Sequence, residues 1–138
     1  MVKQIIKKII SVTLKSDLVS AVKRSLAKIG LTQRTFINGF MHFIANNRFL
    51  PFKKLTKTEE ETANKLATIQ ALKANECEYD KSKMIQKAVD ETIYEKAMTV
   101  LKNCQLTLSH AIRMLYEKFV LTGKMPYQFE VTATAVDM

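Results

Sequence analysis

Hydrophobic and polar positions alternate near the start of the chain and then change to a helical period. Residues 9–14 are predicted as a strand, because apolar and polar side chains alternate there. The two sides of this strand are Ile10, Val12 and Leu14 against Ile9, Ser11 and Thr13. Helical spacing over 18–29 predicts a helix that Ser16 or Asp17 can cap. A second helix, 32–47, should begin at a threonine cap.

The same order of elements returns 75 positions later. Residues 8–52 align with 83–127 without a gap, and the apolar positions agree in class throughout. Residues 83–89 are therefore predicted as a second strand, although Lys87 interrupts its apolar side. Two more helices should follow, with caps at Asp90 and Thr107. A unit this small cannot bury a core of its own, so the two copies are expected to bury each other.

This repeat divides the chain into four predicted segments. They are a first copy at 7–52, a linker at 53–82 with a helix at about 57–75, a second copy at 83–127 and a tail at 128–138. The expected fold is mainly α, with strand, helix and helix twice and the two strands paired as an antiparallel ribbon. In one chain this makes a pseudo-dimer, and exchange of halves between two chains is the alternative that the linker also permits.

The linker has its own pattern. Its helix is expected to open at a capping box, Thr58-Glu59-Glu60-Glu61, with acids that suit the helix dipole. An apolar stripe should run along this helix through Ala63, Leu66, Ile69, Leu72 and Ala74. Residues 75–82 are polar and predicted as a loop. The tail alternates over a few residues, which suits either a short strand or a frayed end.

Composition narrows the class of protein. Three Gly and two Pro in 138 residues argue against sandwiches and barrels with many tight turns. Cys77 and Cys104 have no metal or redox spacing, so a disulfide scaffold is not expected. The expected location is a reducing cytoplasm. No stretch is apolar enough to predict a membrane span, because lysines interrupt even the apolar start of the chain.

The net charge of +9 is unevenly distributed. Residues 1–54 carry +10, residues 55–82 carry −2 and residues 83–138 carry +1. A basic surface of this size attracts polyanions, and nucleic acid is the first to consider. A solvated basic face that serves only solubility is the alternative.

Catalytic patterns are not found in the sequence. There is no Gly-rich phosphate loop and no His, Cys and Asp cluster at ligand spacing. His42 and His110 fall at non-equivalent points of the repeat, whereas a duplicated active site would place them at equivalent ones. An enzyme, a cofactor and a metal are therefore not expected.

The remaining interpretation is DNA binding through the paired strands. A strand–helix–helix unit with one hydrophobic strand face is the half of a ribbon-helix-helix fold, and such a ribbon fits the major groove. The predicted base-reading residues are Ser11, Thr13, Gln86 and Ala88. The predicted phosphate contacts are Lys7, Lys8, Lys15 and the helix amino ends at Thr32 and Thr107. An exposed strand face without a ligand is the alternative.

The second copy also resembles the RelB/DinJ antitoxin family. The family pattern corresponds to Val89-Asp90-Glu91, Leu106-Thr107, Ala111-Ile112-Arg113 and Met125-Pro126-Tyr127. The first copy follows it through Leu31-Thr32, Phe36-Ile37-Asn38 and Leu50-Pro51-Phe52. The resemblance covers about two thirds of the chain. It implies a dimeric ribbon-helix-helix DNA binder that represses its own operon and neutralises a ribosome-dependent mRNA-cleaving toxin through a carboxyl-terminal extension.

The chain departs from that family in three respects. It has two copies, it has Thr13 and Ala88 where a basic groove-facing residue is expected, and only 128–138 follow the second copy. Residues 53–75 resemble the toxin-binding helix but also suit a tether, with Leu66, Ile69 and Leu72 as candidate partner contacts. Two alternatives therefore stay open: a protein-binding module that has lost operator recognition, and an architectural protein that binds nucleic acid without sequence preference.

Overall fold

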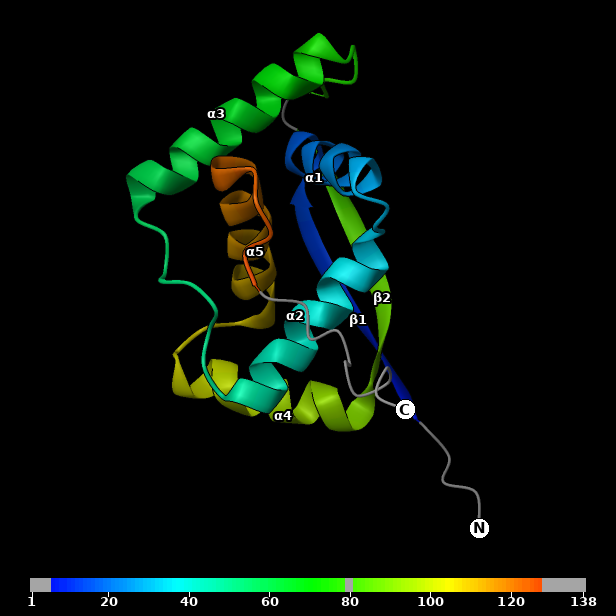
Figure 1. Cartoon of the computed structure of the whole chain (residues 1–138), viewed down its shortest axis with the longest axis vertical. Coiled ribbons are helices and arrows are strands. Elements are labelled where there is room, and N and C mark those ends of the chain that lie inside the picture. Colours follow the sequence, from blue (N-terminus) through cyan, green and yellow to red (C-terminus); the bar gives the residue numbers. More distant parts are fainter. Residues whose placement is uncertain (1–5, 79–80, 128–138) are drawn as a thin grey trace.

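The helices and strands of the chain are seen in a computed structural model, which describes residues 6–78 and 81–127. The described part is mainly helical, with five helices and one two-stranded antiparallel sheet. In chain order (Figure 1) the elements are β1 (Lys7–Lys15), α1 (Ser16–Lys28), α2 (Gln33–Asn47), α3 (Lys57–Lys73), β2 (Ser82–Asp90), α4 (Glu91–Asn103) and α5 (Leu108–Thr122). The predicted tail, 128–138, lies outside the described residues.

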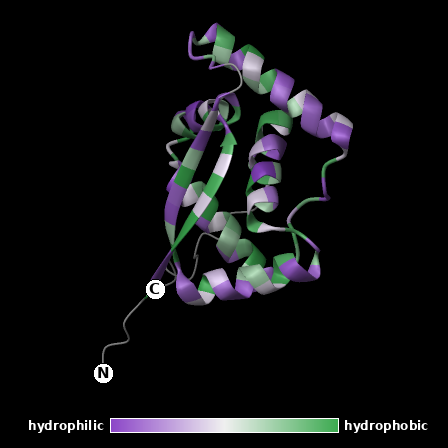
Figure 2. Ribbon diagram, turned by 180° about the vertical axis from the view of Figure 1, so that it is seen from behind, coloured by the Kyte–Doolittle hydropathy of each residue, from purple (hydrophilic) through white to green (hydrophobic). Residues whose placement is uncertain are grey.

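The two predicted strands pair with each other, as expected. β1 and β2 run antiparallel within one chain, from Lys7 opposite Asp90 to Lys15 opposite Ser82. Both strands contain hydrophilic as well as hydrophobic residues (Figure 2). The side with Ile10, Val12, Leu14, Ile85 and Val89 is buried, so the predicted strand faces are confirmed. Lys87 lies opposite Ile10 on this inward side and is partly exposed.

One continuous core joins the elements before and after α3. At its centre Phe36 of α2 packs against Tyr116 and Phe119 of α5, with ring centroids 5.7 and 5.2 Å apart. Tyr127 stacks on Phe36 and its hydroxyl donates a 2.6 Å hydrogen bond to the Phe36 carbonyl. Aromatic pairs at these separations contribute beyond their buried area. The two parts of the chain therefore stabilise each other, as the small size of each copy predicted.

Three of the predicted helix caps are confirmed. Thr32 accepts a hydrogen bond from the Thr35 amide, and Thr107 accepts one from the His110 amide. Asp90 accepts from the amides of Thr92 and Ile93. These bonds satisfy donors that a helix start leaves without partners.

The predicted cap of α1 is wrong. Ser16 and Asp17 lie inside the helix, and Lys15 occupies the cap position without a side-chain bond. The Ser16 hydroxyl instead donates to Glu78, and Asp17 accepts from the Glu78 amide and from the Cys77 thiol. The two side chains therefore hold the loop that leads into β2, a distant contact that local sequence cannot reveal.

Three details of the linker helix also differ from the prediction. The capping box is formed by Thr56 and Glu59, two residues earlier than expected, and the helix ends at Lys73 instead of residue 75. The hydrogen bond from the Thr56 backbone lowers the pKa of the Glu59 carboxyl group. The buried stripe consists of Ala63, Ala67 and Ala71, not of the predicted Leu and Ile positions. Small side chains allow α3 to lie close across α5 and α1 (Figure 1).

Candidate nucleic-acid interface

One side of the sheet is turned away from the core, and we call it the outward sheet face. Residues directly opposite each other in an antiparallel pair share a side. The register therefore gives the outward sheet face as Lys7, Ile9, Ser11, Thr13 and Lys15 on β1 with Ser82, Met84, Gln86, Ala88 and Asp90 on β2. All four predicted base-reading residues lie on it. Ser11, Thr13 and Gln86 are exposed, and Ala88 is partly exposed.

The middle of this face is occupied by Ser11 and Gln86. They are paired across the strands, and Gln86 Nε2 lies 3.2 Å from the Ser11 hydroxyl oxygen, to which it donates a hydrogen bond. The two residues are also 75 positions apart, the offset at which the sequence repeats. On either side of this pair, residues that are equally far from Ser11 and from Gln86 along the two strands lie opposite each other.

Two large apolar residues of this face are not among the predicted base-reading residues. Ile9 and Met84 are 59% and 60% exposed, although both are large and apolar. Ile9 lies opposite Ala88, and Met84 lies opposite Thr13. The alternation with period two was sufficient to find them, because both share the side of the predicted base-reading residues.

The three predicted phosphate-contacting lysines have different positions. Lys7 and Lys15 lie at opposite ends of the outward sheet face, and both are exposed. Lys8 lies on the other side of β1, with its ammonium nitrogen 5.3 Å from the centroid of the Tyr94 ring, a cation–π contact. Lys8 is therefore directed toward α4 and not toward the outward sheet face.

The amino ends of α2 and α5 differ from the other helix starts. Their first turns contain no acid, whereas α1, α3 and α4 each have at least one acid there. Such an end keeps the positive pole of the helix dipole available for an anion. Asn38 fixes α2 beside β2, because its side-chain amide donates to the Ala88 carbonyl at 3.2 Å. Arg34, in the first turn of α2, is exposed.

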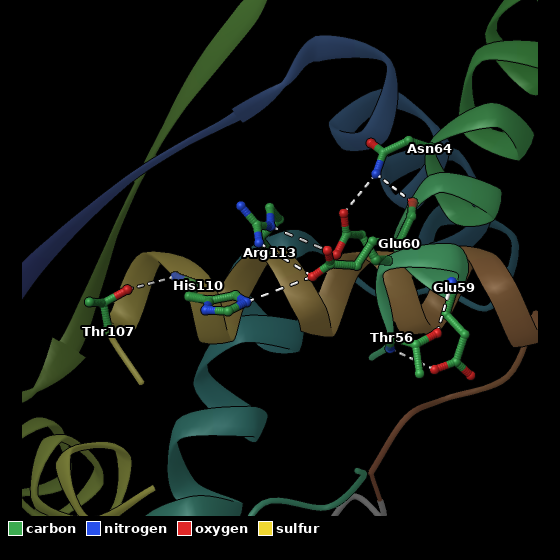
Figure 3. A network of polar contacts seen from close by, with 8 residues as sticks. Thr56, Glu59, Glu60, Asn64, Thr107, His110 and Arg113 are labelled. Atoms are coloured by element: carbon green, nitrogen blue, oxygen red, sulfur yellow. Dashed lines mark hydrogen bonds and ion pairs between the residues drawn. The ribbon is translucent and has the colours of Figure 1, made fainter. Parts of the chain in front are cut away.

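An acidic side chain lies beside the amino-terminal half of α5. No ion pair of the described residues places an acid beside α2. Glu60 of α3 places Oε2 3.4 Å from a guanidinium nitrogen of Arg113 and 3.8 Å from His110 Nε2 (Figure 3). Arg113 occupies the repeat position of Asn38, which bonds to the sheet instead. The linker helix therefore partly neutralises the basic groups at the start of α5 and makes the two helix ends electrostatically unequal.

A buried carboxyl group continues this polar network. Glu117 of α5 is 2% exposed, and Oε2 accepts a 2.7 Å hydrogen bond from the Asn64 side chain of α3. Its other oxygen, Oε1, lies 3.8 Å from Arg113 Nε, which is beyond hydrogen-bond length. Burial raises the pKa of Glu117, and the Asn64 bond and Arg113 oppose this effect. The hydrogen bond between Asn64 and Glu117 joins α3 to α5, whereas the burial of a charged carboxylate opposes this stabilisation.

The predicted partner contacts lie on the other side of α3. Ile69 and Leu72 are 47% and 48% exposed, and Leu66 is partly exposed. Because the alanine stripe docks α3 on the rest of the chain, these three side chains remain outside the core.

Within the described residues, no set of three or more His, Cys, Asp and Glu side chains could hold a metal ion. The helices described are also too short or too polar to cross a membrane. No protein-family model, curated protein or solved structure matches the chain. The outward sheet face and the charges around it are therefore the features that bear on function.

Proposed function

We propose that this protein is a DNA-binding transcription regulator with two tandem ribbon-helix-helix copies in one chain. In this proposal the paired strands enter the major groove with their outward sheet face, and binding at an operator represses transcription. Resemblance to the antitoxin family supports the same class of regulator.

The strand register is the observation that carries the proposal. Ser11 and Gln86 are repeat equivalents, and they pair with each other. Every other pair therefore has a counterpart made of the repeat equivalents of its two residues. For example, Lys7 lies opposite Asp90, and their repeat equivalents, Ser82 and Lys15, lie opposite each other. This is the relation between the two strands of a symmetric dimer, in which a two-fold axis passes between one residue and its own copy. It supports a fused dimer whose sheet has the form of a DNA-reading ribbon.

Charge and helix ends support DNA as the ligand. The outward sheet face has lysines at both ends, and its one acid, Asp90, uses its carboxylate to cap α4. Neither α2 nor α5 has an acid in its first turn, and the amino end of α2 suits phosphate oxygens better because Glu60 lies beside the start of α5. The large positive charge of residues 1–54 supplies the sequence-independent part of the affinity.

A salt titration with duplex DNA tests this proposal. The variant Lys7→Gln/Lys15→Gln removes two charges from the ends of the outward sheet face. If both lysines contact phosphates, the plot of log affinity against log salt becomes shallower by about two units. Lys65→Gln/Lys73→Gln removes the same charge from exposed positions on α3 and should leave the slope nearly unchanged. Absence of duplex binding at low salt, or equal effects of both variants, would refute the proposal.

A second candidate function is that of a protein-binding module, such as a toxin neutraliser. The exposed Ile69 and Leu72 and the partly exposed Leu66 favour it, because apolar side chains in a row on a helix suit a partner surface. Replacing all three with Ser should abolish protection against a toxin of the mRNA-cleaving class while DNA binding persists. Protection without any DNA binding would make this the main function.

A further inference from the structure

The outward sheet face contains exposed apolar side chains that no packing within the chain explains. Ile9 and Met84 are repeat equivalents, and each lies one outward position before the central Ser11 or Gln86 along its strand. Each leaves more than half of its surface in water. The register places them on either side of the Ser11–Gln86 pair, at equivalent positions of the side that would face the groove.

From this composition we infer that the face reads an asymmetric, thymine-rich A·T site, with Ile9 and Met84 contacting thymine methyl groups. The inference rests on the proposed DNA binding and names the sequence class that the same surface would select. In the major groove the thymine C5-methyl is the apolar group that distinguishes A·T from G·C pairs. Apolar side chains on a groove-facing strand therefore favour thymine.

The polar residues of the face agree with A·T pairs. Gln86 donates one hydrogen of its side-chain amide to Ser11, which leaves its second hydrogen and its carbonyl oxygen for the N7 and N6 groups of adenine. Guanine is usually read by Arg or Lys, and cytosine by an acid. Between the terminal pairs, Lys7 with Asp90 and Lys15 with Ser82, the face has no charged side chain.

The face also differs between its two strands. Ile9, Ser11 and Thr13 of β1 correspond in the repeat to Met84, Gln86 and Ala88 of β2. A dimer of identical chains presents the same residues twice and therefore reads a palindrome. Here the two half-faces have no residue in common, so the preferred site is not palindromic. Ile9 to Thr13 spans about 14 Å of strand, which covers about four base pairs.

Selection of bound duplexes from a random pool is the first test. We expect enrichment of a non-palindromic core of about four A·T pairs. Failure to bind any duplex at low salt would refute the proposed function itself. Binding with a palindromic or G·C-rich consensus would overturn only the present inference.

Replacing thymine by deoxyuridine in the selected core is the second test, because it removes the methyl group and keeps base pairing. Each contacted methyl should contribute about fourfold to affinity, the factor expected for burying one carbon group. Met84→Ala and Ile9→Ala should each make one thymine position insensitive to deoxyuridine. The control is Ile29→Ala, which removes an exposed side chain outside the sheet and should change nothing. Unchanged affinity and unchanged sensitivity in both sheet variants would overturn the assignment.

Discussion

An aspartate placed at residue 12 or 13 tests the two sides of β1 with one chemical change. Val12 is 3% exposed and lies opposite the buried Ile85, whereas Thr13 is exposed on the outward sheet face. Val12→Asp introduces a carboxyl group into the core without an opposite charge. Thr13→Asp puts the same group into water one residue later.

The expected magnitudes differ widely. Burial raises the pKa of a carboxyl group by about 3–5 units, and each unit corresponds to about 1.4 kcal/mol near neutral pH. The apolar burial of Val12 that is lost adds about 1.5–3 kcal/mol. Together these are comparable to a whole domain's stability of about 5–15 kcal/mol, so Val12→Asp should be mostly unfolded at neutral pH. Thr13→Asp should cost about 1 kcal/mol or less, since strand propensity is the main change.

Urea unfolding followed by circular dichroism at pH 7.5 and pH 4 is the measurement. The buried carboxyl group of Val12→Asp has a folded-state pKa above its unfolded value. The loss in free energy of unfolding therefore grows as the pH rises from the unfolded-state pKa to the folded-state pKa, and it is relieved at acidic pH. Partial recovery of the transition at pH 4 is expected for Val12→Asp and not for Thr13→Asp. Equal destabilisation by the two substitutions would mean that the strand sides are assigned wrongly.

Three further changes test other contacts. Glu117→Gln keeps an acceptor for Asn64 and removes a buried carboxyl group whose pKa is raised. The melting temperature should therefore rise at pH 7, and the gain should shrink toward pH 4.5; a lower melting temperature at pH 7 would contradict this. Tyr127→Phe removes the buried hydrogen bond to the Phe36 carbonyl and should cost about 1–2 kcal/mol in urea unfolding, whereas no change would mean that this bond is weak. Cleaving one peptide bond beside Cys77 should leave two fragments that elute together in gel filtration, because they share the core; independently folded, separate fragments would refute the shared core.

Much of the local structure could be predicted from the sequence. The period-two alternation assigned Val12 to the core and Thr13 to the outside, and threonine at a helix start identified the caps at Thr32 and Thr107. These features depend on residues close together in the chain. The antiparallel pairing of the strands also followed, because each copy is too small to bury its own core.

The errors share a different origin. Asp17 was predicted to cap a helix but bonds to the loop before β2, about 60 residues away. Leu66 and Ile69 were expected in the buried stripe of α3, but close approach to two helices favours alanines such as Ala67. Glu60 and Arg113 meet across a helix pair that the sequence does not place together. Contacts of this kind depend on how distant elements pack and leave little local signal.

The joining of both strands in one chain affects how the protein responds to its own abundance. A sheet built from two separate chains forms only when the chains meet, so dilution reduces the folded, active fraction. Here β1 and β2 pair within the same molecule, so this sheet forms without an encounter between two chains. The melting temperature should therefore be the same at nanomolar and micromolar protein. A cell that makes only a few copies of this chain would obtain the complete sheet from each of them, and activity would fall in direct proportion to copy number and not with its square.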